Sequence, residues 1–200
     1  MISTRDMQHM KKVILKPGEH FVSAETGVVV STLLGSCIAA CLYDPARRIV
    51  GMNHFLLANH RYSRETPVCL SEAGRYGIHS MELIINGMLK LGADRRLIQA
   101  KVFGGSSMLP GSGTPGNFAC VGEVNCRFIV EFLKNDGIPL MSSDLGGSRG
   151  RIILFDSMDY SVYVRKMKEI VPKVIDREQR YWTHAIRAHE QEEPDTEIWE

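Results

Sequence analysis

Cys37 and His54 are the two residues of this sequence whose side chains combine most readily into a reactive pair. An imidazole can take the proton of a thiol, and the resulting thiolate attacks carbonyl carbon. Cys37 follows a Gly35-Ser36 break, where glycine lets the backbone bend and present amide N–H groups to a developing oxyanion. The sequence therefore predicts acyl-transfer chemistry, with Cys37 as nucleophile, His54 as base, and Gly35 and Ser36 lining the site.

A predicted β-hairpin brings these two residues together. Apolar runs at 37–43 and 49–57 flank Asp44-Pro45, a dipeptide typical of a turn. With a tight reversal there, the register places Cys37 directly opposite His54. A longer loop with a bulge would instead place Ile38 opposite His54. The chemistry requires both side chains on one side of the ribbon, with the sulfur within reach of an amide.

Each residue also has a purely structural interpretation. Cys37 could be a small apolar residue at the start of a core strand, which is the commoner role of a buried cysteine. His54 could be a buried histidine bonded to backbone carbonyls. The glycine bend together with a histidine at the matching hairpin position favours chemistry. Cys41 is predicted to be a core residue, and 111–116 a flexible loop because it lacks the lysine of a P-loop.

The elements that must position the pair follow from hydrophobic periodicity and turn residues. Apolar side chains recur at three- and four-residue spacings in two segments that end before a glycine, which predicts helices at 76–91 and 123–135. Polar segments with glycine or proline at 58–75 and 104–116 predict long surface loops. Strands are predicted at 11–15, 21–23, 28–33, 37–43, 49–57, 97–103, 138–141, 151–155 and 161–166.

The order of these elements predicts an α/β fold with a mixed, largely antiparallel sheet, because strands outnumber helices and short turns join several of them. The 200 residues are 44% apolar and 24% charged, which suits one filled core. We expect that domain at 13–167, after an N-terminal arm at 1–12. Residues 168–200 are expected to form a helical and acidic extension, in which one helical face carries Ile175, Trp182, Ile186 and His189 among charged residues.

Charge and cysteine usage exclude several classes of protein. A net charge of +1 gives no reason to expect a nucleic-acid groove or an anionic membrane surface. The sequence has no apolar run long enough to span a membrane, and residues 1–12 lack the apolar block of a secretory signal, so a cytoplasmic protein is expected. Neither a cofactor nor a metal is predicted. The five cysteines form no CxxC pair and are expected to be reduced thiols: Cys37, Cys41, Cys69, Cys120 and Cys126.

A set of short motifs occurs in one order between residues 17 and 166. The motifs are Thr32–Cys37 (TLLGSC), Leu42–Pro45 (LYDP), Gly51–Leu57 (GMNHFLL), Lys101–Gly105 (KVFGG), Val121–Asn125 (VGEVN) and Asp144–Arg151 (DLGGSRGR). In this combination the chain resembles the CheD family of chemoreceptor glutamine deamidases. The resemblance implies a three-layer α/β/α sandwich and a catalytic cysteine and histidine that fall on Cys37 and His54.

The resemblance also implies a third catalytic residue, a threonine shortly before the cysteine. Counting back without a gap reaches Ser31, while Thr32 lies next to it, so either hydroxyl could orient the histidine, with a slight preference for Ser31. Asn53 is added to the residues predicted to line the site.

The activity implied is deamidation of receptor glutamines to glutamate through a thioester, with hydrolysis of receptor methyl esters also possible. The implied partners are the cytoplasmic helices of methyl-accepting chemotaxis receptors, with the loops at 58–75 and 104–116 as candidate docking segments. The sequence leaves two alternatives open. One is a non-catalytic regulator that binds a CheC-type phosphatase, and the other is a cysteine peptidase.

Overall fold

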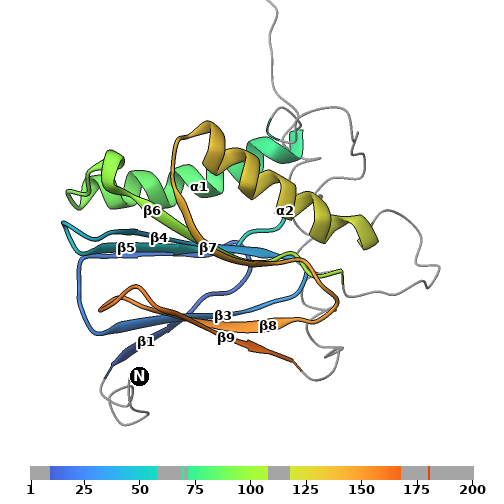
Figure 1. Ribbon diagram of the computed structural model, residues 1–200, viewed down its shortest axis with the longest axis horizontal. Coiled ribbons are helices and arrows are strands. Elements are labelled where there is room, and N and C mark those ends of the chain that lie inside the picture. The colour runs from blue at the N-terminus through green and yellow to red at the C-terminus, as the bar shows by residue number, and fades with distance from the viewer. Residues whose placement is uncertain (1–9, 58–68, 70–71, 108–117, 168–179, 181–200) are drawn as a thin grey trace, which may run out of the picture.

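The computed structural model describes residues 10–57, 69, 72–107, 118–167 and 180 (Figure 1). In chain order its strands and helices are β1 (Lys11–Ile14), β2 (His20–Ser23), β3 (Val28–Leu34), β4 (Ile38–Asp44), β5 (Ile49–Asn53), α1 (Glu72–Lys90), η3 (Arg95–Leu97), β6 (Gln99–Gly104), α2 (Phe118–Asn135), β7 (Leu140–Leu145), β8 (Arg151–Asp156) and β9 (Val162–Lys166). Each predicted strand and helix therefore has a counterpart in the structure.

The strands form two sheets. One has the order β1-β3-β8-β9 and the other the order β2-β5-β4-β6-β7. Each sheet contains one parallel pair, β1 with β3 and β6 with β7, and its other pairs are antiparallel. The predicted α/β class with mixed, largely antiparallel pairing is confirmed.

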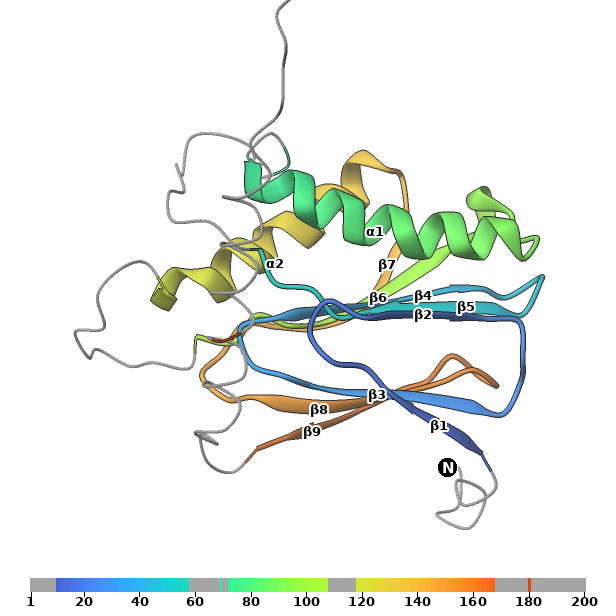
Figure 2. The ribbon, with the colours of Figure 1, turned by 180° about the vertical axis from the view of Figure 1, so that it is seen from behind.

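The order of the layers differs from the expected α/β/α sandwich. Both helices lie over one face of the five-stranded sheet, and the four-stranded sheet lies under its other face (Figures 1 and 2). The order is therefore α/β/β. The physical reason lies at Gly35-Ser36, where the chain leaves β3 in one sheet and enters β4 in the other rather than continuing in the same sheet.

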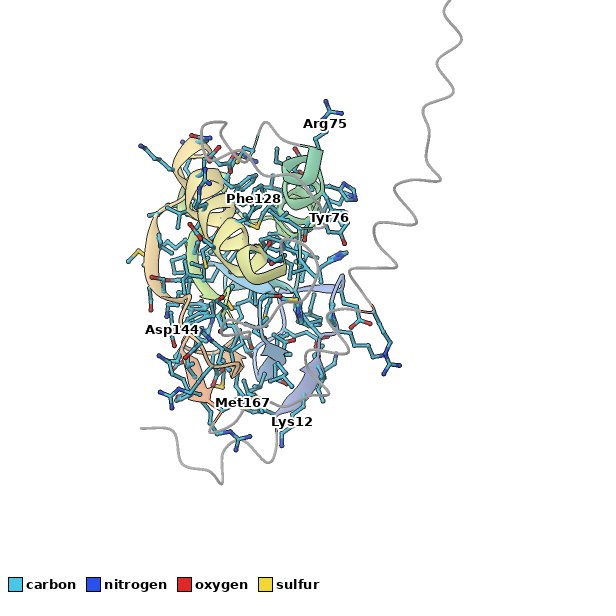
Figure 3. All side chains as sticks on the ribbon, turned by 90° about the vertical axis from the view of Figure 1, so that its right-hand side faces the viewer. Lys12, Arg75, Tyr76, Phe128, Asp144 and Met167 are labelled. Carbon is cyan, nitrogen blue, oxygen red and sulfur yellow. The ribbon has the colours of Figure 1, made fainter. Side chains whose placement is uncertain are left out.

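Two hydrophobic cores occupy the spaces between the layers, and β4 contributes to both. Ile38, Ala40 and Leu42 join the core under the helices, whereas Ala39 and Cys41 belong to the core between the two sheets. Cys37, which immediately precedes β4, belongs to that second core as well. Every residue of β4 is buried, as expected for a central strand covered on both faces. Figure 3 shows Phe128 of α2 in the helical layer, with Lys12 and Met167 at the opposite side of the molecule.

Several predicted boundaries were wrong. The first helix begins at Glu72, inside the segment predicted as a loop, and the second begins at Phe118. Strand β7, predicted to end at residue 141, continues through Leu145, and the chain leaves it at Gly146, whose φ of 73° favours glycine. Three predicted segments lie wholly or mostly outside the described residues. They are the N-terminal arm, the two candidate docking loops, and the C-terminal extension, of which only Arg180 is described. Within the described part of the chain, neither helix combines the length and hydropathy needed to cross a membrane.

Candidate active site

The backbone around Cys37 is held by hydrogen bonds from the segment that follows β6 and from α2. Three successive carbonyls, those of Gly35, Ser36 and Cys37, accept hydrogen bonds of 2.8 Å from Ser106 N, Asn125 Nδ2 and Gly105 N, respectively. In a trans peptide the N–H points opposite to the C=O of the same plane. The Ser36 N–H is therefore directed away from Ser106 N, and the Cys37 N–H is directed away from the Asn125 amide.

Close approach behind Cys37 depends on glycines. A Cβ built on Gly104, whose φ is 118°, would lie 2.0 Å from the Cys37 carbonyl oxygen. A Cβ on Gly122 of α2 would lie 2.6 Å from the carbonyl oxygen of Gly105. Real side chains do not tolerate either distance, so Gly104 lets the end of β6 lie against Cys37, and Gly122 lets α2 lie against Gly105.

His54 follows the end of β5, and its backbone is held by the segment before β2. Its N–H donates to Glu19 O at 3.0 Å, and its carbonyl accepts from Gly18 N at 2.7 Å. The next residue, Phe55, exchanges two hydrogen bonds of 2.9 Å with Ile38. The histidine is thereby fixed beside the first residue of β4.

The predicted register of the hairpin was wrong by two residues. β4 pairs Cys41 with Met52, and the Ile38–Phe55 bridge continues the same register. The structure thus contradicts both the direct pairing of Cys37 with His54 and the alternative pairing of Ile38 with His54. His54 instead lies at the position opposite Ala39.

The cause of the shift is the turn. Asp44 pairs with Ile49, so the reversal includes Pro45 to Arg48. The Asp44 carboxylate accepts from the backbone N–H groups of Ala46 and Arg47 at 2.9 and 3.1 Å. Arg48 completes the loop with a φ of 57°. A shift by two residues preserves the face on which a side chain lies, so Cys37 and His54 are diagonal neighbours on one face of the ribbon.

Thr32 supplies the contact that orients the histidine. Its Oγ1 lies 2.7 Å from His54 Nδ1 and donates to Leu15 O at 2.8 Å. A hydroxyl has one proton, and here that proton goes to the Leu15 carbonyl, so the hydroxyl must accept from an Nδ1–H. This contact selects the tautomer in which Nε2 carries the lone pair, the nitrogen that can accept a proton.

Ser31 faces away from the histidine, because successive side chains of a strand alternate between its two faces. Its Oγ donates to Val13 O at 3.5 Å, toward the neighbouring strand β1. The slight preference for Ser31 is therefore not supported by the contacts, which favour Thr32.

Asn53 also lies on the other face of the ribbon. Its Oδ1 accepts from Ala40 N at 3.0 Å, and its Nδ2 donates to the carbonyl and hydroxyl oxygens of Ser80 in α1 at 3.2 and 3.1 Å. The side chain therefore joins the five-stranded sheet to the helical layer rather than lining the space that holds His54.

The candidate site is enclosed between the two sheets. Cys37 and His54 are 0% exposed and Thr32 is 2% exposed. A low-dielectric surrounding of this kind strengthens the Thr32–His54 hydrogen bond. It also means that an amide can reach the sulfur only after local opening of the surrounding structure.

The other cysteines whose side chains the structure describes are poorly suited to act as nucleophiles. Burial raises the pKa of Cys41, and the nearby Lys101 ammonium opposes this only in part. Burial also raises the pKa of Cys126. Burial and the neighbouring Glu131 carboxylate together raise the pKa of Cys69 to about 12. All three thiols are therefore protonated at neutral pH, which makes them weak nucleophiles.

A buried arginine, Arg151, is connected to the site through hydrogen bonds, a role that the sequence did not predict. The Arg151 guanidinium donates to Ser106 Oγ at 2.8 Å and to the carbonyls of Asp144 and Gly146. It also forms an ion pair of 3.0 Å with the Asp144 carboxylate. Ser106 in turn donates its N–H to Gly35 O, so this network reaches the residues that precede Cys37. Asp144 itself lies in β7 (Figure 3).

The arrangement is chemically suited to acyl transfer: a thiol and an oriented imidazole share one face of a ribbon. Comparisons with known proteins match this chain to one family. The family model described as CheD chemotactic sensory transduction matches residues 56–166. A Geobacter sulfurreducens protein named a probable chemoreceptor glutamine deamidase is 53% identical over 186 residues, 92% of each chain. The chain belongs to the CheD family.

More distant relatives extend the comparison. A Shewanella oneidensis protein, also named a probable chemoreceptor glutamine deamidase, is 45% identical over 177 residues, which cover 86% of this chain and 87% of the relative. Among solved structures, a Neisseria meningitidis protein of the DUF152 family covers 72% of this chain and 65% of its own at 12% identity and a TM-score of 0.42. That likeness is too small to support a conclusion about function.

Proposed function

We propose that this protein deamidates glutamine side chains of methyl-accepting chemotaxis receptors to glutamate, with Cys37 as nucleophile and His54 as base. The names of its relatives support the substrate. The hydrogen bond of 2.7 Å between Thr32 and His54 carries the proposal, because it selects the histidine tautomer that can accept a proton. Thr32 is the positioning residue of this trio.

In the first half of the reaction, His54 Nε2 takes the proton from Cys37 Sγ, and the thiolate attacks the carboxamide carbon of the glutamine. The tetrahedral intermediate carries a negative oxygen, and backbone N–H groups of the segment 35–37 are its proposed donors. His54 then delivers its proton to the nitrogen. The C–N bond breaks, ammonia leaves, and a thioester remains.

In the second half, His54 accepts a proton from water, and the hydroxide attacks the thioester carbon. The C–S bond breaks, the proton returns to the sulfur, and glutamate is released. A methyl ester would pass through the same acyl-enzyme with methanol as the leaving group, so hydrolysis of receptor methyl esters is a second reaction of this site. A substrate on the cytoplasmic helices of receptors requires that the protein act in the cytoplasm.

The decisive experiment incubates the full-length protein with a receptor cytoplasmic fragment and measures ammonia and the mass of receptor peptides. We expect ammonia and conversion of glutamine to glutamate with the wild type and with Cys41→Ala, but none with Cys37→Ala. Shortened fragments would instead indicate a peptidase. If the wild type releases no ammonia but binds a CheC-type phosphatase, the regulatory alternative replaces deamidation.

Access to the buried sulfur needs a separate test, because Cys37 is 0% exposed. We expect iodoacetamide to modify Cys37 in the folded protein, through local opening, faster than it modifies the equally buried Cys41. Mass spectrometry of the two peptides over time measures both rates. If Cys37 reacts only under conditions that unfold the protein, it is not the nucleophile.

A further inference from the structure

One side chain from α2 occupies a position in the β4–β5 ribbon where backbone groups would normally pair. The register that pairs Ile38 with Phe55 brings Ser36 opposite Leu57. In an antiparallel ladder, hydrogen-bonded pairs alternate with non-hydrogen-bonded pairs. Because Ile38 and Phe55 exchange two hydrogen bonds, a regular ladder would next connect Leu57 N–H to Ser36 O.

The carboxamide of Asn125 stands between those two groups. Its Oδ1 accepts from Leu57 N at 2.9 Å, and its Nδ2 donates to Ser36 O at 2.8 Å. The amide thus reproduces the donor and acceptor of the missing ladder bond but adds its own width between the two chain segments. Asn125 is 0% exposed, so these two bonds also satisfy polar groups that would be costly to leave without partners.

This insertion flanks the candidate pair. Ser36 immediately precedes Cys37, and Leu57 lies three residues after His54. The amide bonded to both therefore fixes how far apart the two segments lie. Cys37 and His54 are diagonal rather than direct neighbours, and a diagonal contact depends strongly on the separation and twist of the two strands. An amide that holds this separation therefore holds the distance between sulfur and imidazole.

We infer that Asn125 is a positioning residue that sets the spacing of Cys37 and His54; this rests on the proposed roles of those two residues. The Asn125 side chain contacts neither reacting group and acts through the backbone on either side of them. A change of about 1 Å in such a spacing can lower a rate about a hundredfold.

The test compares Asn125→Asp with Val124→Ala in the full-length protein. Aspartate keeps the size of the side chain and the acceptor for Leu57 N–H, but it presents a carboxylate oxygen to the Ser36 carbonyl in place of a donor. Val124 is the preceding residue of α2 and lies in the core under the helices, so its truncation removes apolar packing from that core but keeps both hydrogen bonds of Asn125. Thermal unfolding establishes that each variant is folded.

We expect Asn125→Asp to lower kcat for ammonia release by about 10- to 100-fold with a less than twofold change in KM. Val124→Ala should leave both values within twofold of the wild type. A loss of kcat of the same size in both folded variants would mean that Asn125 has only a structural role and would overturn the inference.

A second measurement does not depend on the receptor substrate. The rate of Cys37 alkylation by iodoacetamide is measured against pH for wild type, Asn125→Asp and His54→Ala. At pH 7 we expect both variants to react about tenfold more slowly than wild type, because the thiolate forms less readily without a correctly spaced imidazole. If only His54→Ala is slower, the inference fails and the proposed catalytic pair stands. If His54→Ala reacts like the wild type, or if Cys37 never reacts in the folded protein, the pair itself fails and Asn125 has nothing to position.

Discussion

The ribbon formed by β4 and β5 is built differently at its two ends. At the turn end, residues 41–44 pair in register with residues 49–52 through a continuous ladder, and the loop is closed by the Asp44 carboxylate. At the open end, the carboxamides of two asparagines take ladder positions. Asn53 accepts from Ala40 N–H, and Asn125 bridges Ser36 and Leu57.

Each end places one cysteine on the same face of the ribbon, Cys41 within β4 and Cys37 just before it, and both cysteines are fully buried in the core between the sheets. Cys41 has Tyr43 beside it on that face. The Tyr43 ring stacks on the Tyr160 ring with 4.7 Å between centroids, and the Lys101 ammonium lies 5.5 Å from the Tyr43 centroid. Cys37 instead has His54 as a diagonal neighbour. The two cysteines are therefore equally buried and share one core, and the difference comes from the polar groups that other elements bring to the open end.

Replacing the two cysteines in turn tests this difference most strongly. We expect Cys37→Ala to lower kcat/KM for receptor deamidation at least about a thousandfold, because the acyl acceptor is lost. Cys41→Ala should retain activity within about threefold, at a cost in stability of about 1 kcal/mol from the lost side-chain volume. Ammonia release and thermal unfolding measure the two effects. Equal losses of activity in two folded variants would remove the distinction between the ends.

The two hydroxyl residues of β3 sharpen the comparison at the open end. Thr32→Val keeps the shape of the side chain but removes the acceptor for His54 Nδ1–H, so we expect kcat to fall about 10- to 100-fold. Thr32→Ser should restore much of the loss, because it returns the hydroxyl.

Ser31→Ala serves as the matched control for Thr32→Val, since Ser31 faces β1 and not the histidine. Its kcat should stay within twofold of the wild type. Steady-state deamidation with a receptor fragment gives all three values. A larger effect of Ser31→Ala than of Thr32→Val would return the third role to Ser31.

The elements of the fold could be predicted because local signals define them. The helices have apolar stripes, and β3 is a run of β-branched residues that ends at a glycine. The layer order could not be predicted in this way. Whether the chain continues in one sheet or crosses to another at Gly35-Ser36 depends on contacts with β8, which comes more than a hundred residues later.

The site was predicted in part for a related reason. The shared face of Cys37 and His54 was predicted correctly although the register was wrong, because an error of two residues leaves the face unchanged. The contribution of Asn125 was missed, although a signal existed. Asn125 lies four residues after Val121 and three before Phe128, on the buried stripe of α2, where a polar residue requires a specific partner.

The glycine that supports Cys37 should be sensitive to substitution for a steric reason. Gly104→Ala would place a Cβ 2.0 Å from the Cys37 carbonyl oxygen at a φ of 118°. We expect it to lower the free energy of unfolding by about 3 kcal/mol and to reduce activity in the fraction that remains folded, because the Cys37 carbonyl must move.

Gly27→Ala provides the matched control for this steric effect. Gly27 has a φ of 80°, but a Cβ there would meet nothing within 4 Å, so only the backbone strain of about 1 kcal/mol remains. Urea unfolding of both variants measures the difference. Similar losses of stability would show that the close approach to Cys37 is relieved by small shifts of β6.

Weakening the turn end should change stability but not catalysis. The buried Asp44 carboxylate accepts from Ala46, Arg47 and Asp94 N–H groups at 2.8 to 3.1 Å. Asp44→Ala removes these acceptors, and we expect a loss of about 1–2 kcal/mol in the free energy of unfolding, since water can reach part of the loop. Asp44→Asn, which keeps one acceptor oxygen, should lose less.

The kcat of folded Asp44→Ala is the discriminating value. The Ile38–Phe55 bridge, the Asn125 amide and the Thr32 hydroxyl all hold the open end independently of the loop. We therefore expect kcat to stay within twofold of the wild type, as measured by ammonia release below the unfolding temperature. A tenfold decrease would show that the register set by the turn controls the spacing of Cys37 and His54, because the local contacts at the open end would then be insufficient to hold it.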